Sequence, residues 1–270
     1  MENFVTIFNK EFIPQGVAMY ESMEEKINNF KLWIICVDQT TYDYFDNKNN
    51  SNVIPLNLKD FETDEMKAIK KQRSIGEYCW TLTPFTPKFV FDYDPSIERI
   101  TYVDADLYFL RNTERIYKEF ENSKKSVLIT EHAFDAKNDN SKTNGRFCVQ
   151  FIIFQKFGSE EVLNRWQNQC LDWCFSRYED GKFGDQMYLD DWDSKYSDKV
   201  HVLKDKGAAL APWNSQRFSY SEGVFWHFHG LRFGKVFNKL LVSSSDYYIP
   251  KPARKNVYKP YKNKIKKTIY

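Results

Sequence analysis

The sequence predicts an α/β fold with a mainly parallel central sheet flanked by helices. Three short apolar runs, residues 4–8, 31–37 and 53–58, alternate with segments of helical periodicity. This alternation is typical of βαβ units, in which successive strands lie parallel and helices cover the sheet. The chain of 270 residues, with 42% hydrophobic residues, is long and apolar enough to build a sizeable core. Ligands of such sheets bind beside the carboxyl ends of the strands, so functional residues are expected there.

Local signals place the helices and strands in order. Pro14 begins a helix of residues 14–28, because proline suits the first helical turn and this segment has one apolar face. A short helix through Tyr42 and Phe45 follows the second strand, and the charged segment 62–71 is helical in pattern. Two prolines break or kink the next helix. The later elements are helices at residues 76–92, 160–177 and 185–192, and strands at residues 99–110, 126–130, 147–154 and 200–203.

Composition excludes several classes of protein. The 7 Trp, 17 Tyr and 23 Phe exclude a disordered chain, because these side chains need a core to bury them. No apolar run approaches the ~18–20 residues that a membrane-spanning helix needs. The sequence shows no secretory signal peptide, and its five cysteines are scattered. We therefore expect free thiols and a cytoplasmic location.

Two carboxylates stand at the end of an apolar strand. Asp104 and Asp106 follow the run of residues 100–103, and a charge at the end of a buried strand is costly unless it is paired or binds a metal. Residues i and i+2 of a strand project to the same face, so both carboxylates can hold one hard divalent cation. The alternative is a pair of aspartates that form or cap a turn.

These residues carry a resemblance to a known family. Gly-Glu-Tyr-Cys-Trp-Thr-Leu-Thr-Pro at residues 76–84, followed by Tyr-Val-Asp-Ala-Asp-Leu-Tyr at residues 102–108, resembles the retaining GT-A glycosyltransferases of family 8. That family includes glycogenin and bacterial lipopolysaccharide galactosyltransferases. The resemblance implies a GT-A fold, with a Rossmann-like sheet. It also implies that Asp104 and Asp106 hold Mn²⁺, or Mg²⁺, which bridges the diphosphate of a nucleotide sugar.

Two further blocks match the family in chain order. Trp-His-Phe-His-Gly at residues 226–230 resembles its His-Phe-x-Gly motif, which implies that His227 is the third protein ligand of the metal. Gly184, Asp185 and Gln186 resemble its Asp-Gln segment beside the donor sugar, so Asp185 and Gln186 are the expected catalytic residues. A helix cap at Asp185 is the alternative, and both interpretations can hold.

The sequence also departs from the family pattern. The family lysine that pairs with the diphosphate falls on Phe233, and Arg232 and Lys235 are the nearest cations. Either of them can replace that lysine, and Arg232 is the candidate that we assign to the diphosphate. The donor-facing Asn-Ala-Gly of the family aligns with Cys-Val-Gln at residues 148–150, and Met187 replaces a common third acid.

Nucleotide contacts are expected near the first strand. Thr6 and Asn9 lie at its carboxyl end, where a sheet of this kind meets the base or ribose. A helix-entry turn is the alternative role for this segment. The planar guanidinium of Arg73 suits a phosphate or a base, although a solvated arginine in a charged run fits equally well. Neither a dinucleotide-binding fingerprint nor a P-loop motif is present. Trp213 either stacks on a sugar ring or belongs to the core.

The charge is concentrated at the carboxyl end. Residues 251–270 contain eight basic residues and no acidic ones, so the remaining 31 Lys and Arg against 37 Asp and Glu give residues 1–250 a net charge of −6. Basic residues mixed with aromatic ones suit an anionic membrane surface. An acidic body repels phosphates, which argues against nucleic acid as a partner. A solvated, partly disordered tail is the alternative.

Together these observations predict one GT-A domain, residues 1–250, with a basic, aromatic-containing tail at residues 251–270. By resemblance it transfers a sugar from a nucleotide sugar, a UDP-sugar in this interpretation, to a hydroxyl of a glycan or glycolipid with retention of configuration. The tail would hold the enzyme at the inner face of a membrane. A nucleotidyltransferase of similar fold and a non-catalytic nucleotide- or sugar-binding protein remain as alternatives.

Overall fold

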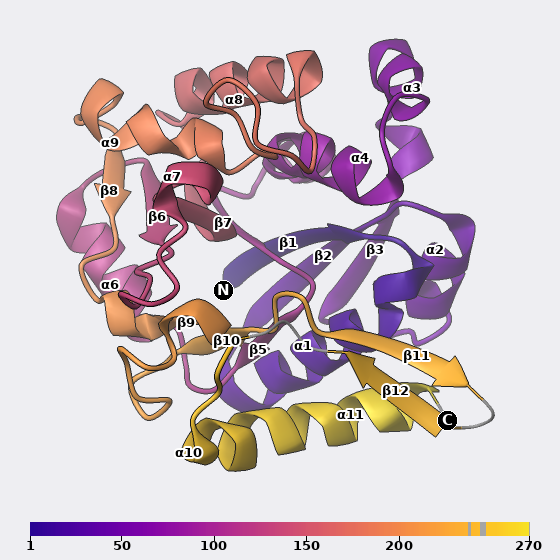
Figure 1. Ribbon diagram of the computed structural model, residues 1–270. Helices are drawn as coiled ribbons and strands as arrows, with labels where there is room; N and C mark the ends of the chain where they lie inside the picture. Colours follow the sequence, from indigo (N-terminus) through magenta and orange to yellow (C-terminus); the bar gives the residue numbers. More distant parts are fainter. Residues whose placement is uncertain (237–238, 244–246, 270) are drawn as a thin grey trace.

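A seven-stranded sheet lies at the centre of the molecule in the computed structural model, which describes residues 1–236, 239–243 and 247–269 (Figure 1). Its strand order is β3-β2-β1-β4-β7-β6-β8, and β7 alone of these seven runs opposite to the others. The predicted α/β class with a mainly parallel sheet is therefore confirmed. The strands are β1 (Glu2–Phe8), β2 (Phe30–Cys36), β3 (Val53–Asn57), β4 (Arg99–Val103), β6 (Val127–Glu131), β7 (Phe147–Gln155) and β8 (Val200–Val202).

Helices cover both faces of this sheet, because its central strands are apolar on both sides. One core cluster joins the sheet to α3, α4, α5, α8 and α9, and the other joins it to α1, α2 and α6. The helices are α1 (Ile13–Lys26), α2 (Gln39–Asp46), α3 (Asp64–Lys70), α4 (Ile75–Leu82), α5 (Thr86–Tyr93), α6 (Glu114–Ser123), α7 (Ser141–Asn144), α8 (Glu160–Asp172) and α9 (Trp192–Lys195).

Short-range chemistry explains where several helices begin. Pro14 lies in the first turn of α1, as predicted. A reciprocal capping box between Ser74 and Glu77 starts α4. The predicted helix of residues 76–92 is divided by a 3-10 turn (Thr83–Phe85) between α4 and α5, because proline cannot donate the backbone hydrogen bond of a continuous helix.

A second, smaller sheet continues the chain beyond β4. The predicted strand of residues 99–110 is two strands, because a turn closed by Leu107 N donating to Asp104 O (3.1 Å) separates β4 from β5 (Leu107–Phe109). The order of this sheet is β5-β10-β9, with β9 (Ala209–Leu210) and β10 (Phe225–His227). A hairpin of β11 (Arg232–Val236) and β12 (Lys239–Ser243) follows.

The carboxyl-terminal segment is a helix of the domain and not a solvated tail. It comprises α10 (Lys251–Ala253), a π-helical turn (Arg254–Tyr258) and α11 (Lys259–Ile269), which runs along α1 (Figure 1). Val257, Tyr261 and Ile265 are fully buried in a cluster with side chains of β5 and β10. Lys264 forms ion pairs of 2.8 Å with two glutamates of α1. The alternative of a solvated, partly disordered tail is therefore wrong, because Val257, Tyr261 and Ile265 are core residues.

The described helices are all too short or too polar to cross a membrane.

Candidate functional site

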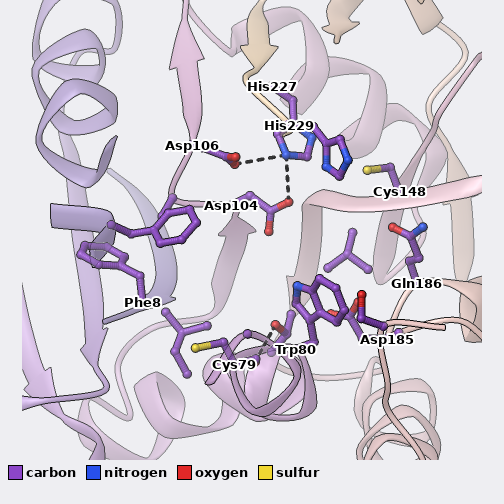
Figure 2. Close-up of a pocket in the computed structure, with 18 of the residues that line it drawn as sticks. Phe8, Cys79, Trp80, Asp104, Asp106, Cys148, Asp185, Gln186, His227 and His229 are labelled. Atoms are coloured by element: carbon purple, nitrogen blue, oxygen red, sulfur yellow. Dashed lines mark hydrogen bonds and ion pairs between the residues drawn. The ribbon is translucent and has the colours of Figure 1, made fainter. Parts of the chain in front are cut away.

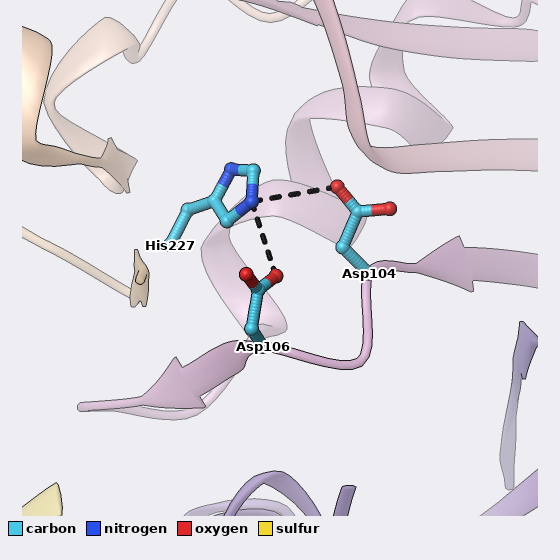
Figure 3. Close-up of side chains that lie close together, drawn as sticks. All are labelled: Asp104, Asp106 and His227. Atoms are coloured by element: carbon cyan, nitrogen blue, oxygen red, sulfur yellow. Dashed lines mark ion pairs between the residues drawn. The ribbon is translucent and has the colours of Figure 1, made fainter. Parts of the chain in front are cut away.

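The turn between the two sheets brings three potential metal ligands together. Asp104 and Asp106 lie in this turn, and β10 pairs antiparallel with β5 so that His227 stands opposite Leu107. The Nε2 atom of His227 is 3.1 Å from Oδ1 of Asp106 and 3.6 Å from Oδ2 of Asp104 (Figure 3). One ligand atom from each residue lies within 4.8 Å of the others. The structure thus assembles the three residues that the sequence predicted as metal ligands.

Burial and charge set the protonation of this cluster. Burial raises the pKa of Asp104 to about 6, against the opposing effect of His227. Burial also acts to raise the pKa of Asp106, but the charge of His227 and its hydrogen bond hold that pKa below the usual value. Burial disfavours the charged imidazole, yet the two carboxylates raise the pKa of His227 well above its usual value. The cluster therefore holds more negative than positive charge once both carboxyls ionise.

The donor set fits a divalent cation. Two carboxylates and one imidazole nitrogen can converge on one ion, and carboxylate oxygens suit Mg²⁺ and Mn²⁺. Burial is the largest cause of the raised pKa of Asp104, and the charge of Asp106 raises it further, so a cation at this point would offset both effects. Tyr102 Oη donates a hydrogen bond of 2.9 Å to Oδ1 of Asp104, which orients this carboxylate.

A cavity of about 440 Å³ opens beside this cluster. It lies at the carboxyl ends of β1 and β4, as expected for a parallel sheet, and its volume is in the usual range for small-molecule sites. Figure 2 shows the labelled side chains of this cavity. The predicted site residues that line it are Asn9, Asp104, Asp106, Asp185, Gln186, His227 and Arg232.

Asp185 and Gln186 stand on the side of the cavity formed by α4 and the chain after α8. Trp166 Nε1 donates a hydrogen bond of 2.8 Å to the backbone oxygen of Asp185, and Gln186 Nε2 donates one of 2.6 Å to Asn144 O. Burial and the charge of Asp104 raise the pKa of Asp185 well above its usual value. Gln186, and not Asp185, holds the cap position of the helical turn that follows.

Arg232 is the cation among the described residues that line the cavity. Its side chain is exposed, and its guanidinium lies 5.4 Å from the ring centre of Phe12. Its charge helps to lower the pKa of Asp106, so it lies within electrostatic reach of the metal cluster. The side chain of Lys235, the other cation that the sequence offered, lies outside the described part of the structure.

Two residues predicted to contact the nucleotide lie outside the cavity lining. Thr6 is fully buried within β1. Arg73 joins two helices: its guanidinium donates to Thr81 in α4 and to the backbone oxygens of Cys170 (2.8 Å) and Leu171 (2.7 Å) in α8. The structure therefore gives Arg73 a role in packing in place of the predicted nucleotide contact.

The aromatic wall behind His227 belongs to the core. Trp213 is only 3% exposed, and its Nε1 donates to His132 O at 2.8 Å. Its ring meets the rings of His227 and His229 edge to face, each with centres 5.4 Å apart. Trp213 therefore packs in the core and supports the imidazole of His227, and it also lines the cavity.

Sequence reasoning missed two residues that hold the cluster in place. Tyr102 contacts Asp104, and Gln150 Oε1 lies 2.9 Å from Nδ1 of His227. Gln150 is a polar residue in the otherwise apolar run Phe-Cys-Val-Gln-Phe-Ile-Ile-Phe, and this interruption was a signal that could have identified it. The alignment with the family had marked the position only as a departure.

Two curated proteins resemble this chain in sequence. The uncharacterized protein YfnD of Bacillus subtilis (strain 168) is 28% identical over 99% of this chain and 89% of its own length. The uncharacterized protein YfnF of the same strain is 26% identical over 85% of this chain and 81% of its own length. No family model matches the chain.

Solved structures with similar folds are glycosyltransferases. Mouse xyloside xylosyltransferase 1 has a TM-score of 0.54 at 14% identity, covering 84% of this chain and 97% of its own. The galactosyltransferase LgtC, in complex with donor and acceptor sugar analogues, has a TM-score of 0.54 at 10% identity, with coverages of 84% and 87%. The glycosyltransferase GlyE of Streptococcus pneumoniae TIGR4 has a TM-score of 0.56 at 13% identity, covering 99% of this chain and 63% of its own. The chain thus has the GT-A fold of these glycosyltransferases, as its sequence motifs implied.

Proposed function

We propose that the protein is a metal-dependent glycosyltransferase that moves a sugar from a nucleotide sugar to a hydroxyl of a glycan or glycolipid. The observation that carries this proposal is the convergence of Asp104, Asp106 and His227 beside a cavity at the carboxyl ends of the strands. The GT-A fold supports the same function. The family resemblance of the sequence supports a UDP-sugar as donor and retention of configuration.

The residues of the cavity have separate roles in this proposal. A divalent cation held by Asp104, Asp106 and His227 would neutralise the negative charge that develops on the leaving diphosphate. Arg232 adds a fixed positive charge for the same diphosphate. On the other side, Asp185 and Gln186 hydrogen-bond the donor sugar and fix its orientation toward the acceptor. Asp185 is buried, with 5% of its surface exposed, and it lines the cavity in which the sugar would lie.

The site can be tested by measuring the Tm of the protein with each of several nucleoside diphosphates, in the presence and absence of Mn²⁺. A ligand at a hundredfold excess over its Kd adds about 2.7 kcal/mol to the free energy of unfolding, which raises the Tm of a chain of this size by about 5–10 °C. We expect UDP to give the largest rise, and only with Mn²⁺. The rise should vanish in Asp106→Asn and persist in Asp198→Asn, a control in which the side chain is 75% exposed. The absence of any nucleotide effect would refute the proposed donor site.

A reaction assay separates the alternatives. A glycosyltransferase without an acceptor slowly hydrolyses its nucleotide sugar in the presence of the metal, whereas a non-catalytic binding protein releases no product. A nucleotidyltransferase would instead release pyrophosphate from a nucleoside triphosphate and a sugar phosphate. We expect free UDP and sugar, and no pyrophosphate.

We also propose that the enzyme works at the anionic, cytoplasmic face of a membrane. The apolar side of the carboxyl-terminal helix packs on the domain, so its attraction to lipid headgroups would come from charge, at about 1 kcal/mol per basic residue. The proposal therefore predicts binding that weakens as salt increases. The exposed basic residues of this helix are Lys251, Arg254, Lys255, Lys259, Lys266 and Lys267.

Charge reversal tests this surface better than deletion, because deletion would remove buried core residues. The test variant carries glutamate at Lys255, Lys259 and Lys266, which are exposed at helical spacing. The control variant carries glutamate at three exposed lysines of other segments. The controls are Lys48, Lys118 and Lys142. Sedimentation with phosphatidylcholine vesicles that contain phosphatidylglycerol should be lost only in the test variant, and equal sedimentation of both variants would contradict the proposal.

A further inference from the structure

Gln150 lies where the two sheets of the site meet. It is fully buried on β7, which pairs with β4 in the large sheet. Its backbone oxygen accepts a hydrogen bond of 3.1 Å from Asp104 N, directly after β4. Its side-chain Oε1 lies 2.9 Å from Nδ1 of His227, on β10 of the small sheet. One residue therefore contacts two of the three candidate ligands, through its main chain and its side chain.

The two nitrogens of the His227 ring face different partners. Nε2 faces the carboxylates of Asp106 and Asp104, which is the side a shared cation would occupy. Nδ1 faces the amide oxygen of Gln150, and an amide oxygen accepts hydrogen bonds but cannot donate them. With the amide oxygen on this side, Nδ1 is the donor of the contact, and a neutral ring in this tautomer offers its lone pair at Nε2. A second hydrogen-bonded partner of this kind orients histidine ligands in metal sites generally.

We propose that Gln150 is a positioning residue that holds His227 in the tautomer and orientation required to bind the metal. This inference rests on the proposed function, because it assumes that the cluster binds a divalent cation. The amide nitrogen of Gln150 has no hydrogen-bond partner among the described residues. A side chain selected for packing alone would be apolar at this buried position, so the contact with His227 is the feature that accounts for a glutamine here.

Three variants of the full chain separate positioning from packing. Gln150→Leu keeps most of the volume and removes the acceptor, whereas Gln150→Glu keeps an acceptor at the same reach. Gln167→Leu is the control, because Gln167 is also buried and its Nε2 donates a hydrogen bond of 3.0 Å to Pro84 O, away from the cluster. Loss of the hydrogen-bond partner of a metal-binding histidine typically weakens metal binding by about 10- to 100-fold.

The first measurement is the affinity for Mn²⁺ alone, from the electron paramagnetic resonance signal of free Mn²⁺ in a titration without nucleotide. We expect weaker binding by about 10- to 100-fold in Gln150→Leu, affinity near the wild-type value in Gln150→Glu, and no change in Gln167→Leu. Wild-type affinity in Gln150→Leu overturns the inference while leaving the metal site intact. Equal losses in Gln150→Leu and Gln150→Glu overturn it too, since any change at a packed position would then suffice. A wild-type chain that binds no Mn²⁺ refutes the metal site itself and, with it, the inference.

The second measurement reads the tautomer directly. In protein with ¹⁵N-labelled histidine and bound Mg²⁺, which is diamagnetic, the chemical shifts of His227 should show a protonated Nδ1 and an Nε2 without hydrogen. The hydrogen on Nε2 would overturn the inference, because the Gln150 amide would then donate to Nδ1. This readout uses the wild-type chain and does not depend on whether the leucine variant folds.

Discussion

Replacing Ile265 by alanine tests whether the carboxyl-terminal helix is part of the folded domain. The Ile265 side chain is fully buried in the cluster that α11 forms with β5 and β10. The substitution removes three carbon atoms at about 0.8 kcal/mol each and leaves a cavity, so we expect a loss of about 3 kcal/mol in the free energy of unfolding. Alanine is the best helix former, so the helix itself is not weakened.

Urea denaturation followed by tryptophan fluorescence measures this loss, and thermal unfolding should show a Tm lower by about 6–12 °C. Lys266→Ala is the matched control, because Lys266 is the exposed neighbour in the same helix. It should change the free energy of unfolding by less than about 0.5 kcal/mol. If Ile265→Ala also stays within this limit, the helix contributes no packing energy and the argument from burial fails. The segment would then behave as the solvated tail that was the alternative interpretation of its sequence.

Three further predictions concern single side chains. Burial lowers the pKa of His132 to about 3, whereas the same side chain in the unfolded chain accepts a proton below about pH 6.5. The free energy of unfolding therefore decreases as the pH falls from about 6.5 toward 3. Between pH 8 and pH 5, protonation of His132 should lower the free energy of unfolding by about 2 kcal/mol. Urea denaturation at the two pH values measures this loss, and the His132→Phe variant should lack this contribution. Arg73→Met should lower the free energy of unfolding by about 3 kcal/mol, because the carbonyls of α8 lose their donor, and calorimetry should find UDP affinity unchanged. Arg232→Ala should weaken UDP binding by about tenfold at low salt, with a smaller effect at high salt, and unchanged binding would remove Arg232 from the diphosphate site.

The sequence was sufficient for those features that depend on local pattern. The alternation of apolar runs and helical segments predicted the sheet, and Asp104 and Asp106 stood out because charge interrupts an apolar run. His227 required the family resemblance, since 120 residues separate it from Leu107, its partner across the small sheet. No local signal connects two strands so far apart in the chain.

Long-range packing decided the features that the sequence did not predict. Arg73 stands in a charged run, and only the position of α8 reveals that carbonyl oxygens take up its donors. Tyr261 stands among lysines, and only the position of α1 and β10 reveals that its ring is core. In both cases the composition of the neighbours suggested exposure, whereas the tertiary partner lay elsewhere in the chain.

The contact between α11 and the strand that carries His227 has a consequence for the order of events during synthesis. Trp226, beside His227, is buried in the same cluster as Tyr261 and Ile265. Asp104 and Asp106 emerge from the ribosome early, but β10 gains its full support only when residues 259–269 have been made. The third candidate ligand, His227, would therefore take its supported position only after α11 had packed against β10.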